Sequence, residues 1–569
     1  MKKSLSNRLS KHSRLLLTLA FGLAVFLFWR FRYPFALTYQ EQLQLFLFDS
    51  DYFAERMAEP GGFARYLAEF LVQFYNGVTI GAAIIALLYM LVQRLTWRIM
   101  RSEDYYIVSF VPALILWYAM GDESLMLTYV VALLIAMLAI WLVGKVFTSW
   151  GYERPMLLRK LGVMIILVPV LYWLIGPMVL LFALFMMPLA VLYALALMFL
   201  SAHFLPFPLS RVMIGISYYR FPAILTMTMA TIPVVIWLIG NFVRLLPKAN
   251  KWVNVATGLL VIVCIGAIVR GLGYDARKYE LIEYDHLVRI QDWKAIIAKA
   301  EKHMPDLPMS VCATNLALGM TNQLGDRAFD FYQRGSEGLL PKFERNFATT
   351  QLTGEVYFHL GMVNLAQCFA FEAMEAIPNY NKSARVVKRL AETNLINGQY
   401  KVAEKYLRLL EKTIFYRPWA QRTIAMLGDE KAIDTHPLYG TLRQYRLQED
   451  FLFSERELDK ICGQLFLHNQ QNQMAAQYLL MMPLLDKDIP RFMSFVKVVQ
   501  NRIPYNPRAI QEGIAFAFMQ QRQQLPQGIV SQYVLQQMNE FGQIYSRDKS
   551  AAGLNRFRNT VWYYLMVGK

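Results

Sequence analysis

Charged residues are scarce in this chain. They make up 17% of its 569 residues, against about 25% in soluble domains. Hydrophobic residues reach 56%, and the stretch 161–202 has no charged residue in 42 positions. A chain with this composition is expected to lie in a membrane, and its 14% aromatic content excludes a disordered protein.

Several common chemical motifs are missing as well. The four cysteines, Cys264, Cys312, Cys368 and Cys462, lie far apart, which excludes a disulfide framework and a cysteine-based zinc site. The sequence has no phosphate-binding glycine loop, HExxH, CxxC or nucleophile elbow. Ionisable residues are nearly absent from the apolar runs, which argues against ion- or proton-coupled transport. Acidic residues are interspersed among the basic ones along the second half, so no nucleic-acid partner is expected.

The first half instead contains apolar runs of roughly 20 residues, the length that crosses a bilayer. The uncharged run 161–202 is too long for one span, and we divide it at Gly176-Pro177 because proline ends a helix. The sequence therefore predicts an all-α fold, with a membrane bundle over 1–272. Its about eight spans are expected at 15–33, 71–93, 105–120, 125–146, 160–176, 178–202, 221–242 and 252–272.

The distribution of charge predicts an orientation. Five Lys or Arg residues precede the first apolar run, so we expect an uncleaved first helix with a cytoplasmic N-terminus. The loops 94–101 and 145–160 are basic, whereas 34–70 and 121–124 are acidic, as loops on the outer side are allowed to be. The basic loop 243–251 conflicts with eight spans, which would place it outside. Eight spans leave the tail in the cytoplasm and seven or nine leave it outside, so the side of the tail is undecided.

Beyond residue 273 the chain changes character. Charge becomes frequent, and the apolar pattern has a helical period with regular turn signals. We expect TPR-like helical repeats over 273–415 and a further α-helical region over 416–569, which either continues the repeats or departs from them. Repeats of this kind present a concave surface, so a protein partner is expected. The candidate units are 291–305, 315–332, 357–378 and 389–412, with helices meeting at the small residues Ala328, Gly361, Ala370, Ala391 and Ala403.

The loop 34–70 is the one place where acidic and basic residues gather beside a membrane span. Its carboxylates are mixed with Leu43, Leu45 and Phe46, which should hold the loop against the membrane surface. A carboxylate held there would have a raised pKa, or would need a metal or an arginine partner. The alternative is a solvated helix beside the membrane, with arginines that anchor lipid headgroups.

A cytoplasmic N-terminus, one span and an acidic, partly helical outer loop resemble the opening of the GT-C glycosyltransferases, over roughly residues 1–100. The resemblance implies that an acidic residue of this loop acts as base for the acceptor or holds a divalent metal near a lipid phosphate. The family's paired acidic motif is absent; Asp49-Ser50-Asp51 is a spaced substitute and Glu41 an alternative. The implied catalytic residues are Glu41, Asp49 and Asp51, and the implied lipid-phosphate ligands are Arg30, Arg32, Arg56 and Arg65.

Two further resemblances cover more of the chain. A GT-C-like bundle followed by TPR-like repeats is similar to the architecture of eukaryotic protein O-mannosyltransferases. The segments YQEQLQLFLF, GGFARYLAEFLVQFY, AFEAMEAIPNY and RLAETNLINGQY resemble an uncharacterised family of polytopic Bacteroidota membrane proteins. That likeness implies a bacterial inner-membrane protein surrounded by membrane lipids, without assigning an activity.

Two functions are therefore hypotheses for this chain. The first is an enzyme that moves a sugar or oligosaccharide from a polyprenyl-phosphate carrier to an extracytoplasmic acceptor, with the repeats binding the acceptor or a partner. No cofactor is assigned to this enzyme with certainty. A divalent metal is an option, and its ligands are not assigned. The second is a non-enzymatic, membrane-anchored TPR scaffold for envelope assembly. The two differ in whether the acidic loop tolerates alanine.

Overall fold

The computed structural model is all-helical, with no β-strand among the residues it describes. Those residues are 2–150, 154–248, 250–379, 381–449, 457–499, 502–503, 506–547 and 552–568. Contacts divide the chain into two units. Unit 1 comprises Met1–Tyr279 with two short later segments, Ile377–Ala384 and Glu411–Arg417, and unit 2 comprises Glu280–Ala376, Arg385–Leu410 and Pro418–Lys569.

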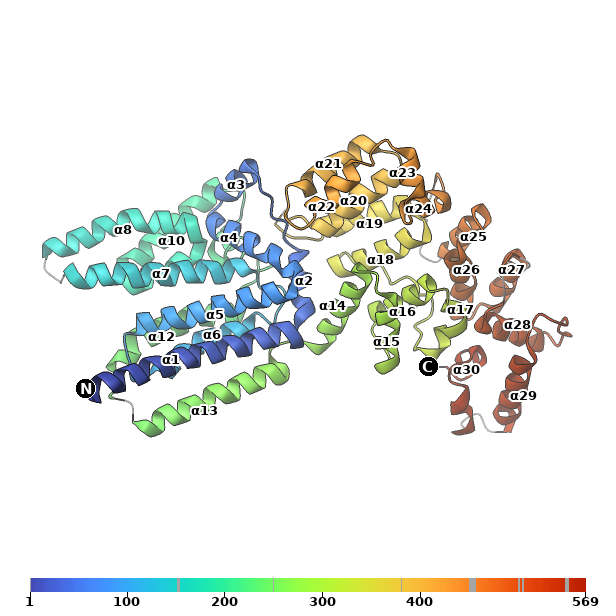
Figure 1. Cartoon of the computed structure of the whole chain (residues 1–569), viewed down its shortest axis with the longest axis horizontal. Coiled ribbons are helices and arrows are strands. Elements are labelled where there is room, and N and C mark those ends of the chain that lie inside the picture. Colours follow the sequence, from blue (N-terminus) through green and yellow to red (C-terminus); the bar gives the residue numbers. More distant parts are fainter. Residues whose placement is uncertain are drawn as a thin grey trace. The chain divides into compact units, whose positions relative to one another are not determined.

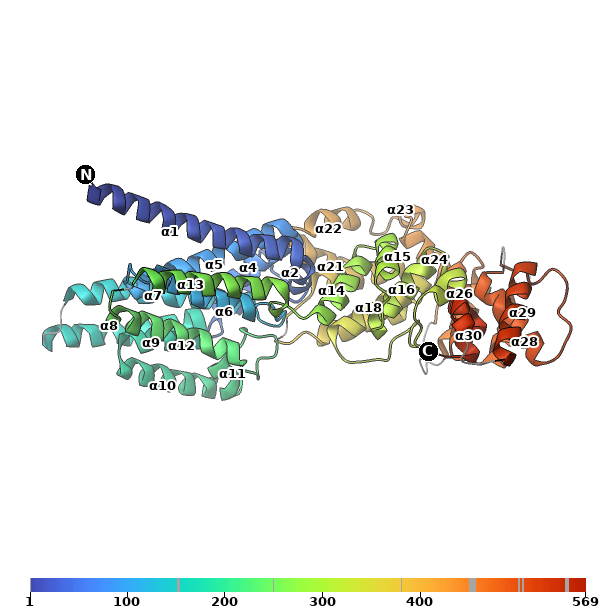
Figure 2. The same cartoon turned by 90° about the horizontal axis from the view of Figure 1, so that it is seen from below.

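Unit 1 contains the long apolar helices (Figures 1 and 2). Six stretches are long and apolar enough to cross a membrane: His12–Arg32, Val78–Met100, Leu127–Ser149, Leu158–Met186, Met227–Leu245 and Trp252–Leu272. Tyr106–Ala119 and Pro188–Phe204 are shorter apolar helices. The helices of unit 1 are α1 (Lys2–Leu27), α2 (Pro34–Glu41), α3 (Ser50–Met57), α4 (Gly62–Val72), α5 (Val78–Met100), α6 (Val111–Ala119), α7 (Leu127–Trp150), α8 (Arg154–Ile175), α9 (Val179–Met186), α10 (Pro188–Phe204), α11 (Leu209–Ile214), α12 (Met227–Phe242) and α13 (Lys251–Ala267).

Polar contacts between α1 and α5 give their relative direction. The Arg14 guanidinium lies 3.4 Å from the Glu103 carboxylate, and the Thr18 hydroxyl donates to the Gln93 amide at 3.0 Å. Residue numbers rise along one helix as they fall along the other, so the two helices are antiparallel. The predicted span 71–93 begins later than expected, at Val78, because a 3-10 turn over Gln73–Asn76 separates it from α4.

The bundle has two chemically different ends. We call the end that holds Arg14 and Glu103 the basic end. We call the opposite end, where the Tyr33 hydroxyl donates to the Gly121 carbonyl at 3.2 Å, the loop end. Helix α6 returns from the basic end to the loop end, and α7 runs back. The return of α7 is shown by Thr148 near its end, which accepts a hydrogen bond from Arg101 at 3.2 Å.

The uncharged run 161–202 turns at Gly176, as the sequence predicts. Gly176 has a φ of +59°, which glycine adopts without strain, and α8 ends at the residue before it. The Tyr193 hydroxyl donates to the Ile165 carbonyl at 3.3 Å, and the hydroxyls of Tyr172 and Ser201 lie 2.5 Å apart. Residue numbers therefore rise together along α8 and α10, so these helices run in the same direction.

The prediction of a single span over 178–202 is wrong. The run is broken between α9 and α10, because Met187 is extended (φ −169°, ψ 152°) and Pro188 starts a new helix at its first position. Helix α9 runs back from the loop end, and α10 returns to it. The run 178–202 therefore contains two helices of opposite direction where one span is expected, and α9, with eight residues, is too short to cross a bilayer by itself.

The last two apolar helices decide where the chain leaves the bundle. Helix α12 starts at the loop end, where the Tyr129 hydroxyl donates to the Met229 carbonyl at 2.8 Å. It ends at the basic end, where the Tyr105 hydroxyl donates to the Pro247 carbonyl at 2.8 Å. Helix α13 then runs back, and Lys278 beyond it pairs with Glu123 of the loop end at 3.2 Å. The chain thus leaves unit 1 at the end opposite its N-terminus.

Unit 2 consists of shorter helices. The structure describes them as α14 (Ala276–Arg289, which starts in unit 1), α15 (Trp293–Lys302), α16 (Pro308–Met320), α17 (Leu324–Arg327), α18 (Phe347–Leu360), α19 (Val363–Glu375), α20 (Ala384–Ile396), α21 (Tyr400–Glu411), α22 (Arg417–Ile424), α23 (Glu430–Thr435), α24 (Tyr439–Tyr445), α25 (Leu458–His468), α26 (Gln473–Leu485), α27 (Ile489–Val499), α28 (Arg508–Gln520), α29 (Gln532–Arg547) and α30 (Val561–Met566). Parts of the expected region 416–569, including 450–456 and 548–551, lie outside the described residues.

Consecutive helices joined by short turns recur in unit 2, as in α18–α19, α20–α21 and α25–α26, and contacts pair α18 with α19 and α25 with α26. Ala370 and Ala403 are buried in such pairs, as the repeat pattern predicts. Gly361 acts differently from the prediction: it ends α18 with a φ of +95°, a turn conformation that favours glycine. The predicted unit 315–332 is not a helix pair either, because α16 is followed only by the four-residue α17 and a 3-10 turn.

Two buried carboxylates of unit 2 have opposite electrostatic environments. Burial raises the pKa of Glu355, but Arg389 at 2.7 Å and Arg385 at 3.4 Å outweigh it and lower that pKa to about 2. Glu512 is also buried, and its pKa is raised to about 7 by burial, because the Val561 amide and Arg508 at 3.6 Å compensate incompletely. Glu512 is therefore a destabilising charge at pH 8.

We predict that Glu512→Gln stabilises the protein at high pH only. The folded-state pKa of about 7 exceeds the unfolded value of 4.5, so the folded protein binds the extra proton between these values and loses stability as pH rises through this window. In detergent, the midpoint of thermal unfolding should be equal for both proteins near pH 4.5. At pH 8 the midpoint of the variant should be higher than that of wild type. The corresponding gain in the free energy of unfolding is up to about 3 kcal/mol.

The matched control is Glu540→Gln, because Glu540 is half-buried and pairs with Arg556 at 2.9 Å. It should give no gain at pH 8. Equal midpoints for wild type and Glu512→Gln at both pH values would contradict the assignment.

Candidate functional site

The acidic loop folds at the loop end of unit 1 as the three short helices α2, α3 and α4. Asp49 starts α3 as its N-cap, and its carboxylate accepts a hydrogen bond from the Asp51 amide at 2.8 Å. Asp49 also pairs with Lys412, and the Phe48 amide donates to the Lys412 carbonyl at 2.9 Å. The Lys412 hydrogen bond, with the Asp51 amide, lowers the pKa of Asp49. Asp49 is therefore ionised and a weak base.

A cavity of about 170 Å³ opens beside Asp49, and we call it the loop cavity. Asp51 and Glu55 on α3 line it and are solvent-exposed. Its cationic residues are Arg56 and Lys382, the latter from the segment Ile377–Ala384 of unit 1. The cavity thus combines carboxylates with cations at the end of an apolar bundle, an arrangement suited to a substrate with hydroxyl and phosphate groups. The other lining residues are Leu45, Leu47 and Tyr52.

Behind the cavity, Glu69 of α4 is buried between two arginines. Its carboxylate accepts from Arg56 Nε at 2.8 Å and from Arg65 Nε at 3.0 Å, and it also accepts a hydrogen bond from Tyr52. Burial raises the pKa of Glu69, but Arg65 and Arg56 outweigh burial, so the pKa is lowered. Arg65 additionally reaches Asn381 at 2.5 Å. This Glu69 network ties α3, α4 and the segment Ile377–Ala384 together.

The remaining candidates lie apart from the loop cavity. Glu41 is 4% exposed and accepts a hydrogen bond from the Tyr416 hydroxyl at 3.3 Å. Arg30 and Arg32 lie in a π-helical turn at the end of α1, where Arg32 stacks over the Tyr274 ring at 5.1 Å. The structure therefore brings Asp49, Asp51 and Arg56 to one cavity. It places Arg65 in the Glu69 network and leaves Glu41, Arg30 and Arg32 elsewhere.

Sequence reasoning missed two members of the cavity. Glu55 lies one helical turn after Asp51 and could have been chosen by its i+4 spacing. Lys382 is remote in sequence, and no local pattern points to it. For a divalent metal, no group of three or more His, Cys, Asp or Glu side chains suited to hold an ion occurs in the part of the chain that the structure describes.

A second cavity of about 360 Å³ also lies at the loop end, where α6 ends and α12 begins. Asp122, Glu123 and Asp275 contribute carboxylates, and Lys278 pairs with Glu123. Asp122 accepts a hydrogen bond from the Tyr219 hydroxyl at 2.7 Å. Asp122 and Glu123 are thus already engaged in holding the helix ends, which makes this cavity a weaker candidate for a substrate site.

We predict that Glu69→Gln disrupts the loop end. Removing one partner of a buried ion cluster leaves two buried arginines without their shared counter-charge, which costs about 3–5 kcal/mol. Limited proteolysis in detergent should cut the 45–65 region much faster than in wild type. Glu55→Gln is the matched control, because the Glu55 side chain is 66% exposed; its proteolysis pattern should not change. Equal resistance of Glu69→Gln and wild type would contradict a structural role for the network.

The comparisons with known proteins concern the whole chain. No curated protein and no solved structure matches it. A family model, described as a family of unknown function (DUF6057), matches residues 10–568 and so covers both the apolar bundle and the helical second unit. The chain is a member of the DUF6057 family of unknown function.

Proposed function

We propose that this protein is a membrane-embedded transferase that moves a sugar or oligosaccharide from a polyprenyl-phosphate carrier to an acceptor outside a bacterial inner membrane. The loop cavity is the observation that carries the proposal, because it places Asp49 and Asp51 beside Arg56 and Lys382. Carboxylates serve to activate a hydroxyl, and cations serve to stabilise a departing phosphate.

The proposed chemistry assigns one role to each side chain. Asp51 takes the proton of the acceptor hydroxyl, whose oxygen forms the new bond to the sugar carbon. The bond from that carbon to the carrier phosphate breaks, and the phosphate leaves with the electron pair. Lys382 and Arg56 hold the leaving phosphate by charge-assisted hydrogen bonds. Asp49, with its lowered pKa, positions Asp51 at the start of α3.

The other candidates keep secondary roles in the proposal. Glu41 is the alternative base, although its burial and its bond to Tyr416 restrict access. Arg30 and Arg32 at the end of α1 are positioned to meet a carrier phosphate at the membrane surface. Arg65 acts through Glu69 and Asn381 as a positioning residue. No step is assigned to a metal.

We also propose that the loop end and unit 2 are both extracytoplasmic. The direction of the helices gathers Arg14, Arg101 and Pro247 at the basic end, which the positive-inside rule assigns to the cytoplasm. The loop 243–251 then no longer conflicts with the rule. Since α13 returns to the loop end, the chain leaves unit 1 at that end, which is extracytoplasmic in this proposal.

The scaffold alternative has an observation in its favour. The Glu69 network and the Lys412 pair use Arg56, Arg65 and Asp49 to hold the loop end together. In that case the charges are structural, and the helix pairs of unit 2 bind partner proteins. A test of activity at Asp51 separates the two functions, because Asp51 takes part in neither structural interaction through its side chain.

We expect Asp51→Asn to abolish function without loss of fold. A deletion strain complemented with this variant should resemble the deletion: envelope glycans are lost, and the carrier-linked precursor accumulates. Loss of a general base slows the reaction about 10²–10⁴-fold. Asp104→Asn is the control, because Asp104 is an exposed acid at the basic end, and it should restore wild-type glycans. Membrane levels of all variants are compared by blotting.

If the deletion leaves every glycan unchanged, the transferase function is wrong. If the deletion alters glycans while Asp51→Asn, Asp49→Ala and Glu41→Ala all restore them, the loop cavity is not the active site and the scaffold function is favoured.

The orientation has its own test. Alkaline phosphatase fused after Lys569 should be active, and green fluorescent protein fused there should be dark, because the tail lies outside. Both fusions inserted in the loop 243–251 should give the reverse pattern. A fluorescent fusion after Lys569 would contradict the proposed orientation and leave the acceptor without access through unit 2.

A further inference from the structure

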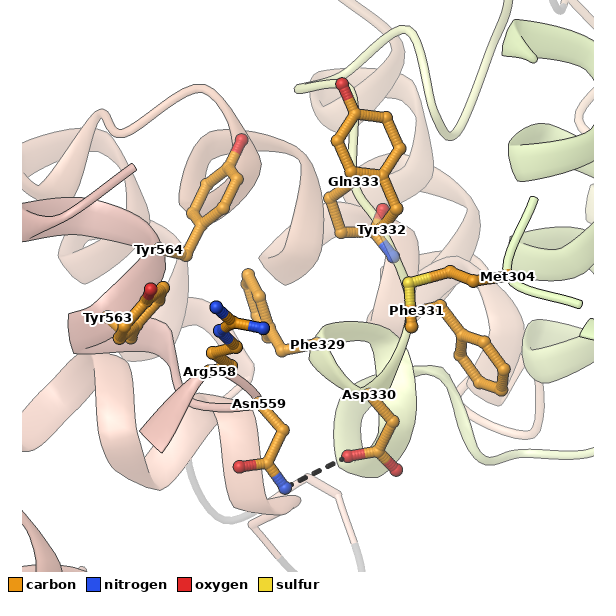
Figure 3. Close-up of a pocket in the computed structure, with 10 residues that line it drawn as sticks. All are labelled: Met304, Phe329, Asp330, Phe331, Tyr332, Gln333, Arg558, Asn559, Tyr563 and Tyr564. Atoms are coloured by element: carbon orange, nitrogen blue, oxygen red, sulfur yellow. Dashed lines mark hydrogen bonds between the residues drawn. The ribbon is translucent and has the colours of Figure 1, made fainter. Parts of the chain in front are cut away.

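Unit 2 contains a cavity of about 170 Å³ that is independent of the membrane bundle and of the proposed transferase function. We call it the aromatic cavity, because five aromatic rings line it: Phe329, Phe331, Tyr332, Tyr563 and Tyr564 (Figure 3). They come from the segment after α17 and from α30, which are more than 200 residues apart in sequence but adjacent here. All of them belong to unit 2.

The walls of the aromatic cavity are held in place by contacts of their own. Phe329 and Phe331 are 5% and 6% exposed, and the rings of Phe329 and Tyr564 lie 5.2 Å apart. The Tyr564 hydroxyl donates to the Leu485 carbonyl at 2.7 Å, and Gln333 donates to the Ala328 carbonyl at 2.6 Å. The cavity is therefore formed before any ligand enters, which reduces the entropy lost on binding.

The charges around the cavity favour an anion. Asp330, the acidic residue of the lining, is neutralised by Arg508 at 3.0 Å and Arg327 at 3.5 Å, and it also accepts from Asn559 at 3.4 Å. By contrast, Arg558 is solvent-exposed at the mouth of the cavity, and its guanidinium has no hydrogen bond or ion pair among the described residues. Figure 3 shows this guanidinium among Phe329, Tyr563 and Tyr564.

We propose that the aromatic cavity binds a carboxylate attached to an apolar or aromatic group, held by Arg558. A guanidinium binds a carboxylate through two parallel, charge-assisted hydrogen bonds. The aromatic rings bury the apolar part of the ligand next to that charge. A free small acid and the C-terminal residue of a peptide share this chemistry.

Size limits the ligand further. Cavities for drug-sized ligands measure about 300–1,000 Å³, so a cavity of about 170 Å³ admits one residue-sized group.

The experiment measures equilibrium binding to the full-length protein in detergent. The probes are N-acetyl-phenylalanine and a ten-residue peptide that ends in phenylalanine, each as the free acid and as the C-terminal amide. We expect the acids to bind wild type at least about tenfold more tightly than the amides, because a hydrogen bond to a charged group is lost in the amide. Arg558→Gln should weaken binding of the acids by a similar factor.

Arg556→Gln is the matched control. Arg556 lies two residues away, pairs with Glu540 at 2.9 Å and stacks over the Phe557 ring at 4.7 Å. This variant should bind the acids as wild type does, and equal thermal midpoints confirm that both variants are folded.

Tighter binding of the peptide acid than of the small acid identifies a peptide C-terminus as the ligand, and binding of the small acid alone identifies a metabolite. Three results overturn the proposal: no binding of any probe to wild type at millimolar concentration, equal binding of acid and amide, or unchanged binding by Arg558→Gln.

Discussion

The loop end of unit 1 depends on the buried carboxylate of Glu69. Two arginines and a tyrosine surround it. Tyr52 and Arg56 come from α3, whereas Arg65 lies on α4 with Glu69 and also reaches Asn381. Taking these charges out of water is costly unless all of them are paired, so the cluster holds only when α3, α4 and the segment Ile377–Ala384 are in place together. The loop cavity exists because that condition is met.

The bilayer imposes the complementary constraint. Backbone groups in hydrocarbon must be hydrogen-bonded within the protein, so the long apolar runs form helices, and ionisable side chains are found near the helix ends. In this chain the two ends differ: one collects Lys and Arg, and the other collects carboxylates with their arginine and lysine partners. Charged side chains therefore gather at the loop end because they are excluded from the middle of the bundle.

Sequence patterns anticipated part of this arrangement. Apolar runs predict the helices because hydrophobic length is a local property, and the turn at Gly176 is explained by its proline neighbour. The break at Met187 was missed because Pro188 lies in a run where every residue is apolar, and hydropathy cannot distinguish one long helix from two. Asp49 and Asp51 were found as a local pair, whereas Glu41, also in the loop, faces Tyr416 instead of the cavity. The helix pairs of unit 2 agree with the periodicity, but Gly361 serves a turn and 315–332 does not pair.

The sequence by itself determined the features that depend on composition and short-range order: an all-helical chain, an apolar first half, an acidic loop after the first helix and a charged, helical second half. Tertiary structure alone decided which of those residues meet. Lys382 and Lys412 reach the acidic loop, and Arg558 reaches Phe329, across hundreds of residues of chain. The physical reason is that such contacts arise from packing of whole helices, whose directions depend on every preceding turn. The short helix α9 reverses the direction of the chain, and with it the end of the bundle at which the later residues emerge.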